Sequence, residues 1–195
     1  MEDGFAKNYI EELKKTLDML PLDKIKEAAG LILEAFNQNK QVFIMGNGGS
    51  AVNASHFACD LSKGTLRRMY DPNEKRFRVT SLTDNVATIT AYANDLSYDD
   101  IFVQQLRNLA QPRDLIIVLS GSGNSANIIR VLHYAKDTGL KTIALLGFDG
   151  GGACNLADCP IVVPSNHYGR IEDTHLVLHH LITSYFYELK NNAKI

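Results

Sequence analysis

A glycine-rich turn with a histidine and an aspartate behind it is the part of this chain best equipped for chemistry. Residues 45–51 read Met-Gly-Asn-Gly-Gly-Ser-Ala and follow an apolar run that begins at Gln41. Backbone amides and the Ser50 hydroxyl of such a turn can close around an anionic group. His56 and Asp60 are four residues apart, so on a helix they share one face and suit an acid–base pair or a metal site. The turn therefore predicts an enzyme that acts on a small phosphorylated metabolite.

A second turn of the same kind, Ser-Gly-Ser-Gly-Asn-Ser at 120–125, follows the apolar run 114–119. Glycine permits tight turns, and the helix behind offers free N–H groups and the positive end of its dipole. Serine and glycine can also simply cap helices. Two such turns at the carboxyl ends of strands nevertheless favour phosphate binding. Neither matches a Walker loop or a dinucleotide fingerprint, so we expect a sugar phosphate rather than a nucleotide.

The elements that must position these turns alternate between strand and helix along the chain. Most strand candidates are β-branched or apolar throughout, as expected for strands covered on both faces. This alternation predicts an α/β fold with a five-stranded parallel sheet flanked by helices. The expected strands are 41–45, 77–82, 114–119, 141–146 and 160–163, and the expected helices are 50–62, 85–93, 98–110, 125–138 and 170–191.

Two further helices, at 5–20 and 22–37, precede the first strand and are separated by Pro21. The first has no partner strand, so its apolar residues must be covered in another way, and we expect it to dock against another subunit. At 195 residues the chain is expected to be one domain, with N-terminal helices in 1–38 and an α/β part in 39–195. The apolar residues of the first helix are Ile10, Leu13, Leu17 and Leu20.

The composition argues against several other classes of function. A net charge of −2 gives no general attraction to nucleic acid or to an anionic membrane. The basic residues of the long polar loop 63–76 and its end are interpreted as solvated: Arg67, Arg68, Lys75, Arg76 and Arg78. The polar, acidic segment at the start of the sequence is not expected to be a signal peptide, and no apolar run approaches the ~20 residues of a membrane span. The three cysteines form no Cys-x-x-Cys pair, so we expect reduced thiols in a cytoplasmic protein.

Four segments resemble the phosphoheptose isomerases, which are single-domain members of the sugar isomerase (SIS) fold. They read GNGGSAVNASHFACDL, SLTDNVATITAYANDLSYDDIF, LSGSGNSANIIRVLHYAKDTGLKTIALLGFDGG and VVPSNHYGRIEDTH, and the resemblance extends over about 17–188. It implies interconversion of sedoheptulose 7-phosphate and D-glycero-D-manno-heptose 7-phosphate, an early step toward bacterial surface heptoses such as those of lipopolysaccharide. It also implies a homotetramer with sites shared between subunits, and one zinc ion per subunit.

The resemblance also implies roles for particular residues. The serine-rich turn would hold the phosphate through Ser120, Gly121, Ser122 and Ser125, and the first turn would contact the substrate through Asn47, Gly48, Gly49 and Ser50. Asp84, Asn85 and Asp95 would lie near the sugar. Catalysis and zinc binding would fall on His56, Asp60, Glu172 and His180.

The last helix contains two further histidines. Glu172 and His180 lie on one helical stripe, whereas Glu172, His175 and His179 share another. Periodicity alone does not choose between His179 and His180, and His175 with His179 is itself a metal-compatible pair. Only the match to the family favours His180.

The chain departs from the family pattern at several positions. Asp60 stands in place of the usual glutamate, Glu172 in place of glutamine, and Gly121 in place of threonine. The arginine that shortly follows the family glutamate has no clear counterpart, and the loop 65–76 is longer. We expect Glu172 to be the principal proton-transfer carboxylate or a metal ligand, with Asp60 assisting. The altered residues leave open a sugar other than a heptose.

Two other functions are compatible with parts of the sequence. A non-catalytic SIS scaffold that binds the replication initiator protein would share the glycine-rich turns, but Asp60, Glu172 and His180 argue against it. A sensor domain of a transcription regulator would need a DNA-binding region, and the N-terminal helices lack a basic helix-turn-helix pattern.

Overall fold

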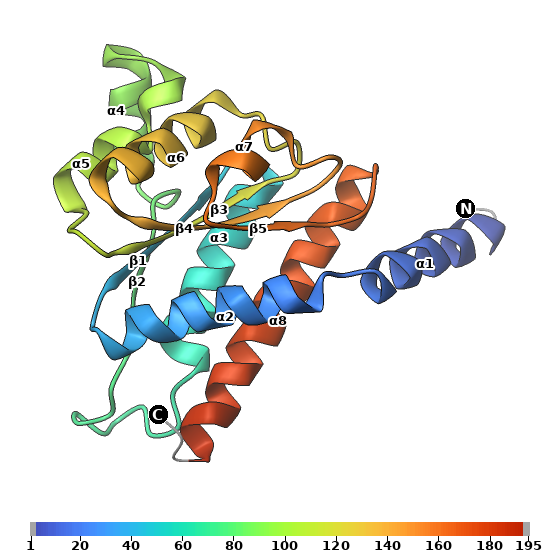
Figure 1. Ribbon diagram of the computed structural model, residues 1–195, viewed down its shortest axis with the longest axis horizontal. Coiled ribbons are helices and arrows are strands. Elements are labelled where there is room, and N and C mark those ends of the chain that lie inside the picture. Colours follow the sequence, from blue (N-terminus) through green and yellow to red (C-terminus); the bar gives the residue numbers. More distant parts are fainter. Residues whose placement is uncertain (1–2, 193–195) are drawn as a thin grey trace.

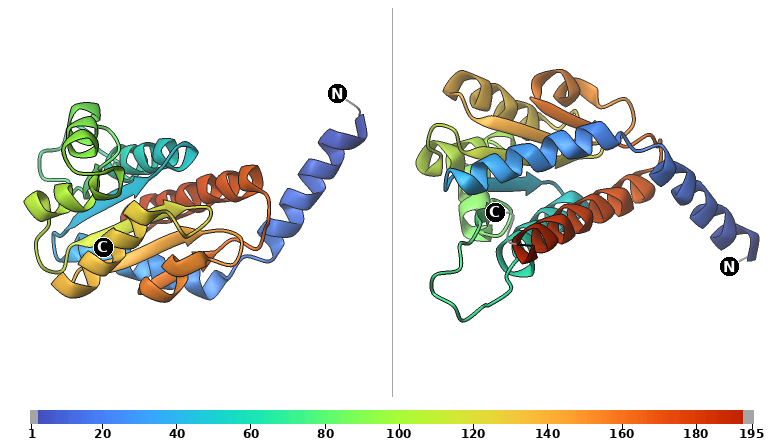
Figure 2. Two further views of the ribbon diagram at one scale, coloured as in Figure 1. Left: turned by 90° about the horizontal axis from the view of Figure 1, so that it is seen from above. Right: turned by 60° about the horizontal axis from the view of Figure 1, so that its bottom comes forward.

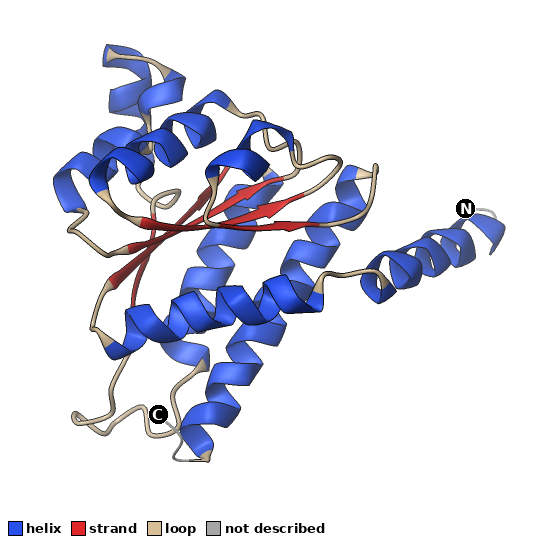
Figure 3. Ribbon diagram, viewed as in Figure 1, coloured by secondary structure: helices blue, strands red, loops and turns tan. Residues whose placement is uncertain are grey.

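Five parallel strands form one sheet, and helices cover both of its faces (Figure 3). The computed structural model describes residues 3–192, so residues 1–2 and 193–195 of the expected segments 1–38 and 39–195 lie outside it. The strands are β1 (Gln41–Gly46), β2 (Arg78–Ser81), β3 (Leu115–Ser120), β4 (Lys141–Leu146) and β5 (Cys159–Val162). The expected α/β fold with a five-stranded parallel sheet is confirmed.

The helices that pack on the sheet form two layers, one on each face (Figures 1 and 2). One apolar core lies between the sheet and α2, α3 and α8, and a second lies between the sheet and α5, α6 and α7. The helices are α1 (Asp3–Asp18), α2 (Leu22–Asn37), α3 (Gly49–Cys59), α4 (Val86–Asp95), α5 (Val103–Leu109), α6 (Ala126–Thr138), α7 (Gly151–Leu156) and α8 (Tyr168–Asn191), with a π turn, η1 (Asp60–Gly64), and a 3₁₀ turn, η2 (Tyr98–Asp100).

The strand order β2-β1-β3-β4-β5 determines where a ligand can bind. The chain proceeds from β1 to one edge and from β3 to the other, so the order reverses between β1 and β3. Gly46 at the end of β1 is the register partner of Leu119 near the end of β3. Open α/β sheets bind ligands at the carboxyl ends of the strands at such a switch point. Both glycine-rich turns begin there.

Two of the expected elements differ from the structure, and one observed helix was not expected. The prediction of a single helix over 98–110 is wrong, because η2 and α5 are separate elements. Ile101, Phe102 and Val103 are all buried, and three consecutive residues of a surface helix cannot all face the core. The helix expected over 50–62 becomes the π turn η1 from Asp60 onward. Helix α7 was not expected, because it is short and begins with two glycines.

Helix α1 leaves the rest of the chain and projects away from the sheet (Figure 1). It is attached through the Tyr9 hydroxyl, which donates to Asp173 Oδ2 at 2.6 Å, and through an ion pair of Glu12 with Arg170 at 3.6 Å. Part of its apolar surface stays in solvent, since Phe5 is 65% exposed and Ile10 52%, whereas Leu13 and Leu17 are half-buried. No helix among residues 3–192 is long and apolar enough to cross a membrane.

The long polar loop after η1 is fastened to the last turns of α8. The Glu74 carboxylate accepts hydrogen bonds from the backbone N–H groups of Arg67 and Arg68 at 2.9 and 2.7 Å. It also pairs with Lys190 at 3.0 Å, and both side chains of this pair are less than a tenth exposed. The backbone donors, together with Lys190, lower the pKa of Glu74 from 4.5 to about 2.

This pairing predicts a pH-dependent contribution of Glu74 to stability. Because the pKa of Glu74 is lowered by folding, its contribution is present above pH 4.5 and is lost as the pH falls toward about 2. We expect Glu74→Gln to lower the melting temperature at pH 7 by roughly 2–6 °C. The gap to the parent protein should narrow at pH 3, as measured by circular dichroism. Glu34→Gln, on an exposed residue of α2, is the control, and an equal gap at both pH values would contradict the assignment.

Candidate functional site

The two glycine-rich turns are joined by a network of polar side chains. Asn47, in the first turn, exchanges amide hydrogen bonds with Asn127 in the first turn of α6, at 2.9 and 3.0 Å. The Tyr98 hydroxyl donates to the same Asn47 amide oxygen at 3.0 Å. Asn127 is only 2% exposed, so this contact lies inside the molecule. The network fixes the first turn against the helix that follows the second turn.

The first turn brings Glu172 of α8 against the start of α3. Gly48 has a φ of +55°, a conformation that favours glycine. Gly49 lies directly beneath the Glu172 carboxylate, because a Cβ at position 49 would lie 2.6 Å from Glu172 Oε2. The positive end of the α3 dipole favours a carboxylate at this place. The Glu172 carboxylate thus lies at the glycine-rich turn, in which Ser50 is buried.

The second turn presents one hydroxyl that the turn itself does not use. Ser120 Oγ accepts from the Gly123 N–H at 3.1 Å, and Ser122 Oγ accepts from the Asn124 N–H at 3.2 Å. Ser125 is the N-cap residue of α6, but its side chain makes no capping hydrogen bond. A hollow beside the turn is lined by Ser122, Asn124, Phe148, Asp149, Asn166 and Tyr168. A helix N-terminus with a free serine hydroxyl is suited to a phosphate.

The glycine at position 121 has a steric reason. A Cβ at this position would lie 3.1 Å from the Tyr168 ring, which also packs edge-to-face on Phe148 at 4.9 Å. Where the family resemblance leads one to expect a threonine side chain, this chain places part of a tyrosine ring.

The second half of the site is a cluster of side chains where α3 and α8 run side by side in the same direction. Asp60 Oδ2 lies 3.4 Å from His56 Nε2, 3.3 Å from His179 Nε2 and 3.4 Å from His180 Nε2. One ligand atom from each of the four residues lies within 4.8 Å of the others. His56 and His180 are about half exposed, whereas His179 is fully buried. The cluster therefore has a buried side and a side open to solvent.

This donor set fits a divalent cation such as zinc, which takes imidazole nitrogen and carboxylate oxygen. One carboxylate oxygen cannot accept well-directed hydrogen bonds from three rings, and both ring nitrogens of His179 lack a hydrogen-bond partner among the described residues. Tetrahedral ligands at zinc bond lengths are separated by about 3.3–3.4 Å. Three of the six separations between the ligand atoms, the nitrogen–oxygen distances of 3.3–3.4 Å, match this spacing, and all six are within 4.8 Å.

The protonation of the buried histidines is set by their surroundings. Burial lowers the pKa of His179 from 6.5 to about 4, and the adjacent His180 and His56 lower it too, against the raising effect of Asp60. A neutral imidazole is the form that binds metal. Burial likewise lowers the pKa of His175 to about 4, and its Nε2 lies 3.1 Å from the Leu146 carbonyl oxygen. His175 thus ties α8 to β4 and lies outside the cluster.

The structure brings together only part of the expected site. Of the four residues expected to hold zinc, His56, Asp60 and His180 meet in the cluster, and Glu172 lies outside it, at the first turn. Three more expected residues are exposed around α4. Asp84 accepts from the Ser55 hydroxyl, Asn85 caps α4 by accepting from the Thr88 N–H, and Asp95 accepts from Asn94.

Sequence reasoning missed several side chains of the site. Periodicity did not distinguish His179 from His180, and only the family match favoured His180, yet α8 presents both neighbouring histidines to Asp60. Asn127 and Tyr98 carry no motif, and their role follows only from the contact between the turns. Two adjacent histidines opposite the His56–Asp60 pair were the available signal for His179.

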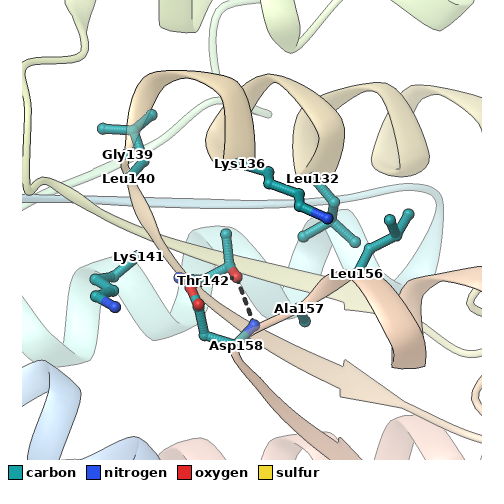
Figure 4. Close-up of a pocket in the computed structure, with 9 residues that line it drawn as sticks. All are labelled: Leu132, Lys136, Gly139, Leu140, Lys141, Thr142, Leu156, Ala157 and Asp158. Atoms are coloured by element: carbon teal, nitrogen blue, oxygen red, sulfur yellow. Dashed lines mark hydrogen bonds between the residues drawn. The ribbon is translucent and has the colours of Figure 1, made fainter.

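A different pocket lies at the opposite, amino end of the sheet (Figure 4). It is bounded by the end of α6, the start of β4 and the segment before β5. Two of its lining residues, Thr142 and Asp158, are joined by reciprocal hydrogen bonds. Thr142 Oγ1 accepts from the Asp158 N–H at 2.8 Å, and the Thr142 N–H donates to Asp158 Oδ2 at 2.9 Å. It contains none of the expected site residues.

Comparisons with known proteins identify the family of this chain. Residues 6–147 match the SIS domain family. A phosphoheptose isomerase of Helicobacter pylori (strain P12) is 36% identical over 185 residues, covering 93% of both chains, and one of Alteromonas mediterranea is 38% identical over 186 residues, covering 92% of this chain and 91% of its own. The solved structure of a phosphoheptose isomerase from Francisella tularensis superposes with a TM-score of 0.85 at 28% identity, over 95% of this chain and 96% of that one. The chain therefore belongs to the phosphoheptose isomerase family of SIS-domain proteins and is a sugar-phosphate isomerase.

Proposed function

We propose that this protein converts sedoheptulose 7-phosphate to D-glycero-D-manno-heptose 7-phosphate with the help of zinc, as part of heptose biosynthesis. The observation that carries the proposal is the placement of Glu172 at the first glycine-rich turn, with the cluster of His56, Asp60 and His180 further along the same two helices. The names of the relatives support the substrate.

The two turns divide the work of substrate binding. The serine-rich turn binds the phosphate through Ser120, Ser122 and Ser125, backed by the N–H groups at the start of α6. Asn47 and Ser50 of the first turn, together with Asp84 and Asp95, contact the sugar hydroxyl groups. The other contributors to the substrate site are Gly48, Gly49, Asn85 and Gly121.

An aldose–ketose isomerase removes a proton beside a carbonyl and returns it to the neighbouring carbon. Glu172 is the proton carrier in this proposal, because its carboxylate lies at the edge of the first turn. His180 and Asp60 act on the sugar oxygens, and half of the His180 side chain is exposed to solvent. Bound zinc would supply Lewis-acid stabilisation of negative charge on the sugar oxygens.

The proposed assembly is a homotetramer in which subunits complete one another's sites. Support comes from α1, which projects with an exposed apolar surface and is attached through Asp173, the neighbour of Glu172 in α8. The three cysteines are free thiols, in keeping with a cytoplasmic location.

Proton NMR in deuterated water tests the function. With sedoheptulose 7-phosphate and zinc we expect a new aldose anomeric signal, and deuterium at carbon 2 if the proton passes through an enediol. The same experiment on pentulose and hexulose phosphates decides whether Tyr168 beside the serine-rich turn has changed the preferred sugar. Conversion of none of these substrates would contradict the proposal.

Replacing the proposed proton carrier should abolish most of the turnover. We expect Glu172→Gln to reduce kcat by at least about 100-fold, because the amide keeps the shape of the side chain but cannot take up a proton. Steady-state kinetics with Glu188→Gln, on an exposed residue of the same helix, provide the control. Undiminished turnover in Glu172→Gln would exclude the role.

Removing the unused hydroxyl of the serine-rich turn should weaken substrate binding. We expect Ser125→Ala to raise KM by about tenfold with a smaller effect on kcat, because a hydrogen bond to a charged phosphate is lost. Inorganic phosphate should inhibit the variant less than the parent protein. Ser184→Ala, on an exposed residue of α8, should change neither quantity, and a Ser125→Ala variant that behaves like this control would remove Ser125 from the phosphate site.

A further inference from the structure

His179 is a fully buried imidazole with no hydrogen-bond partner on either ring nitrogen among the described residues. Burying a polar group without a partner costs free energy, so such a group calls for an explanation. Its Nε2 points into the cluster and lies 3.3 Å from Asp60 Oδ2. His56 and His180 approach the same oxygen about as closely. An ion pair between His179 and Asp60 alone therefore does not account for the burial of the His179 ring.

The ring of His179 is held in one orientation by its neighbours. Phe57 of α3 stacks on it with the ring planes 14° apart and the centroids 5.2 Å apart. His56 and His180 meet it edge-to-face at centroid distances of 4.6 and 4.2 Å. A preorganised ring loses little freedom when it binds a ligand. The packing therefore presents one nitrogen of His179 to the same point as the other three side chains.

Glu172 is placed where it does not take part in this cluster. It precedes His180 by eight residues on α8, a rise of about 12 Å along the helix axis. Its backbone carbonyl accepts from the Asn53 amide at 3.2 Å, and its carboxylate lies against Gly49. The four ligand atoms of the cluster belong to His56, Asp60, His179 and His180, and Glu172 contributes none of them.

We propose that His56, Asp60, His179 and His180 together form the metal site of this chain. His179 is then the fourth metal ligand, a role that the family resemblance assigns to Glu172. Glu172 is then free of the metal and keeps its carboxylate for proton transfer. The exposed sides of His56 and His180 leave the outer face of the cluster open to solvent. This inference rests on the proposed zinc-assisted isomerase and assigns its metal to particular side chains.

Zinc affinity of the full-length protein, measured without substrate by competition with a chromogenic chelator, tests the assignment. We expect His179→Leu to weaken zinc binding by at least about tenfold, since even loss of an outer partner of a ligand costs this much. Glu172→Gln and the exposed control His133→Leu should bind zinc as the parent protein does. Weaker binding in Glu172→Gln, together with parental affinity in His179→Leu, would overturn the inference.

A measurement on the parent protein does not depend on the folding of the variants. X-ray absorption at the zinc edge should require three imidazole ligands, whereas a site made with Glu172 in place of His179 would require two and would overturn the assignment. Neither experiment depends on turnover. A protein that binds zinc through three histidines but converts no heptulose phosphate would contradict the proposed reaction alone.

Discussion

The parallel course of α3 and α8 along one face of the sheet is the constraint on which the rest of the site depends. Glycine allows the two helices to approach at both ends of their contact: Gly49 lies under Glu172, and a Cβ at Gly64 would come within 3.2 Å of Thr183. The Asn53 amide bonds the α8 backbone between these points. Because the helices run in the same direction, the contact between their first turns determines which residues meet further along the pair. The carboxylate at the first turn and the histidine cluster are therefore positioned by a single helix pair.

The sheet supplies the other half of the geometry. Its buried strands β1 and β3 end side by side, so their two turns are neighbours although more than 70 residues separate them in the chain. The hydrogen bond between Asn47 and Asn127 fixes the distance between the first turn and the start of α6. A phosphate on the serine-rich turn and a sugar on the first turn would then belong to one ligand. This arrangement follows from strand order and needs no additional domain.

The sequence was informative wherever a residue type acts locally. Helix α2 and strand β4 have the predicted limits. Pro21 marks the start of α2, and the apolar run of residues 143–146 forms most of β4. The glycine-rich turns and the His56–Asp60 pair were predictable for the same reason. What could not be predicted depends on contacts between distant segments. Periodicity treated His179 and His180 as alternatives, but at the contact with α3 both rings reach Asp60.

The π turn that follows α3 has a consequence for how the family can vary. Asp60 is the first residue of this π turn. The α-helical winding of α3 therefore ends where the last side chain of the cluster on this segment begins. A π turn encloses one more residue per hydrogen-bonded ring than an α turn. An inserted residue can be absorbed there without rotating His56 or Asp60. Insertions downstream of Asp60, such as the extended segment that Glu74 fastens to α8, can therefore accumulate while the register of the chemistry upstream stays unchanged.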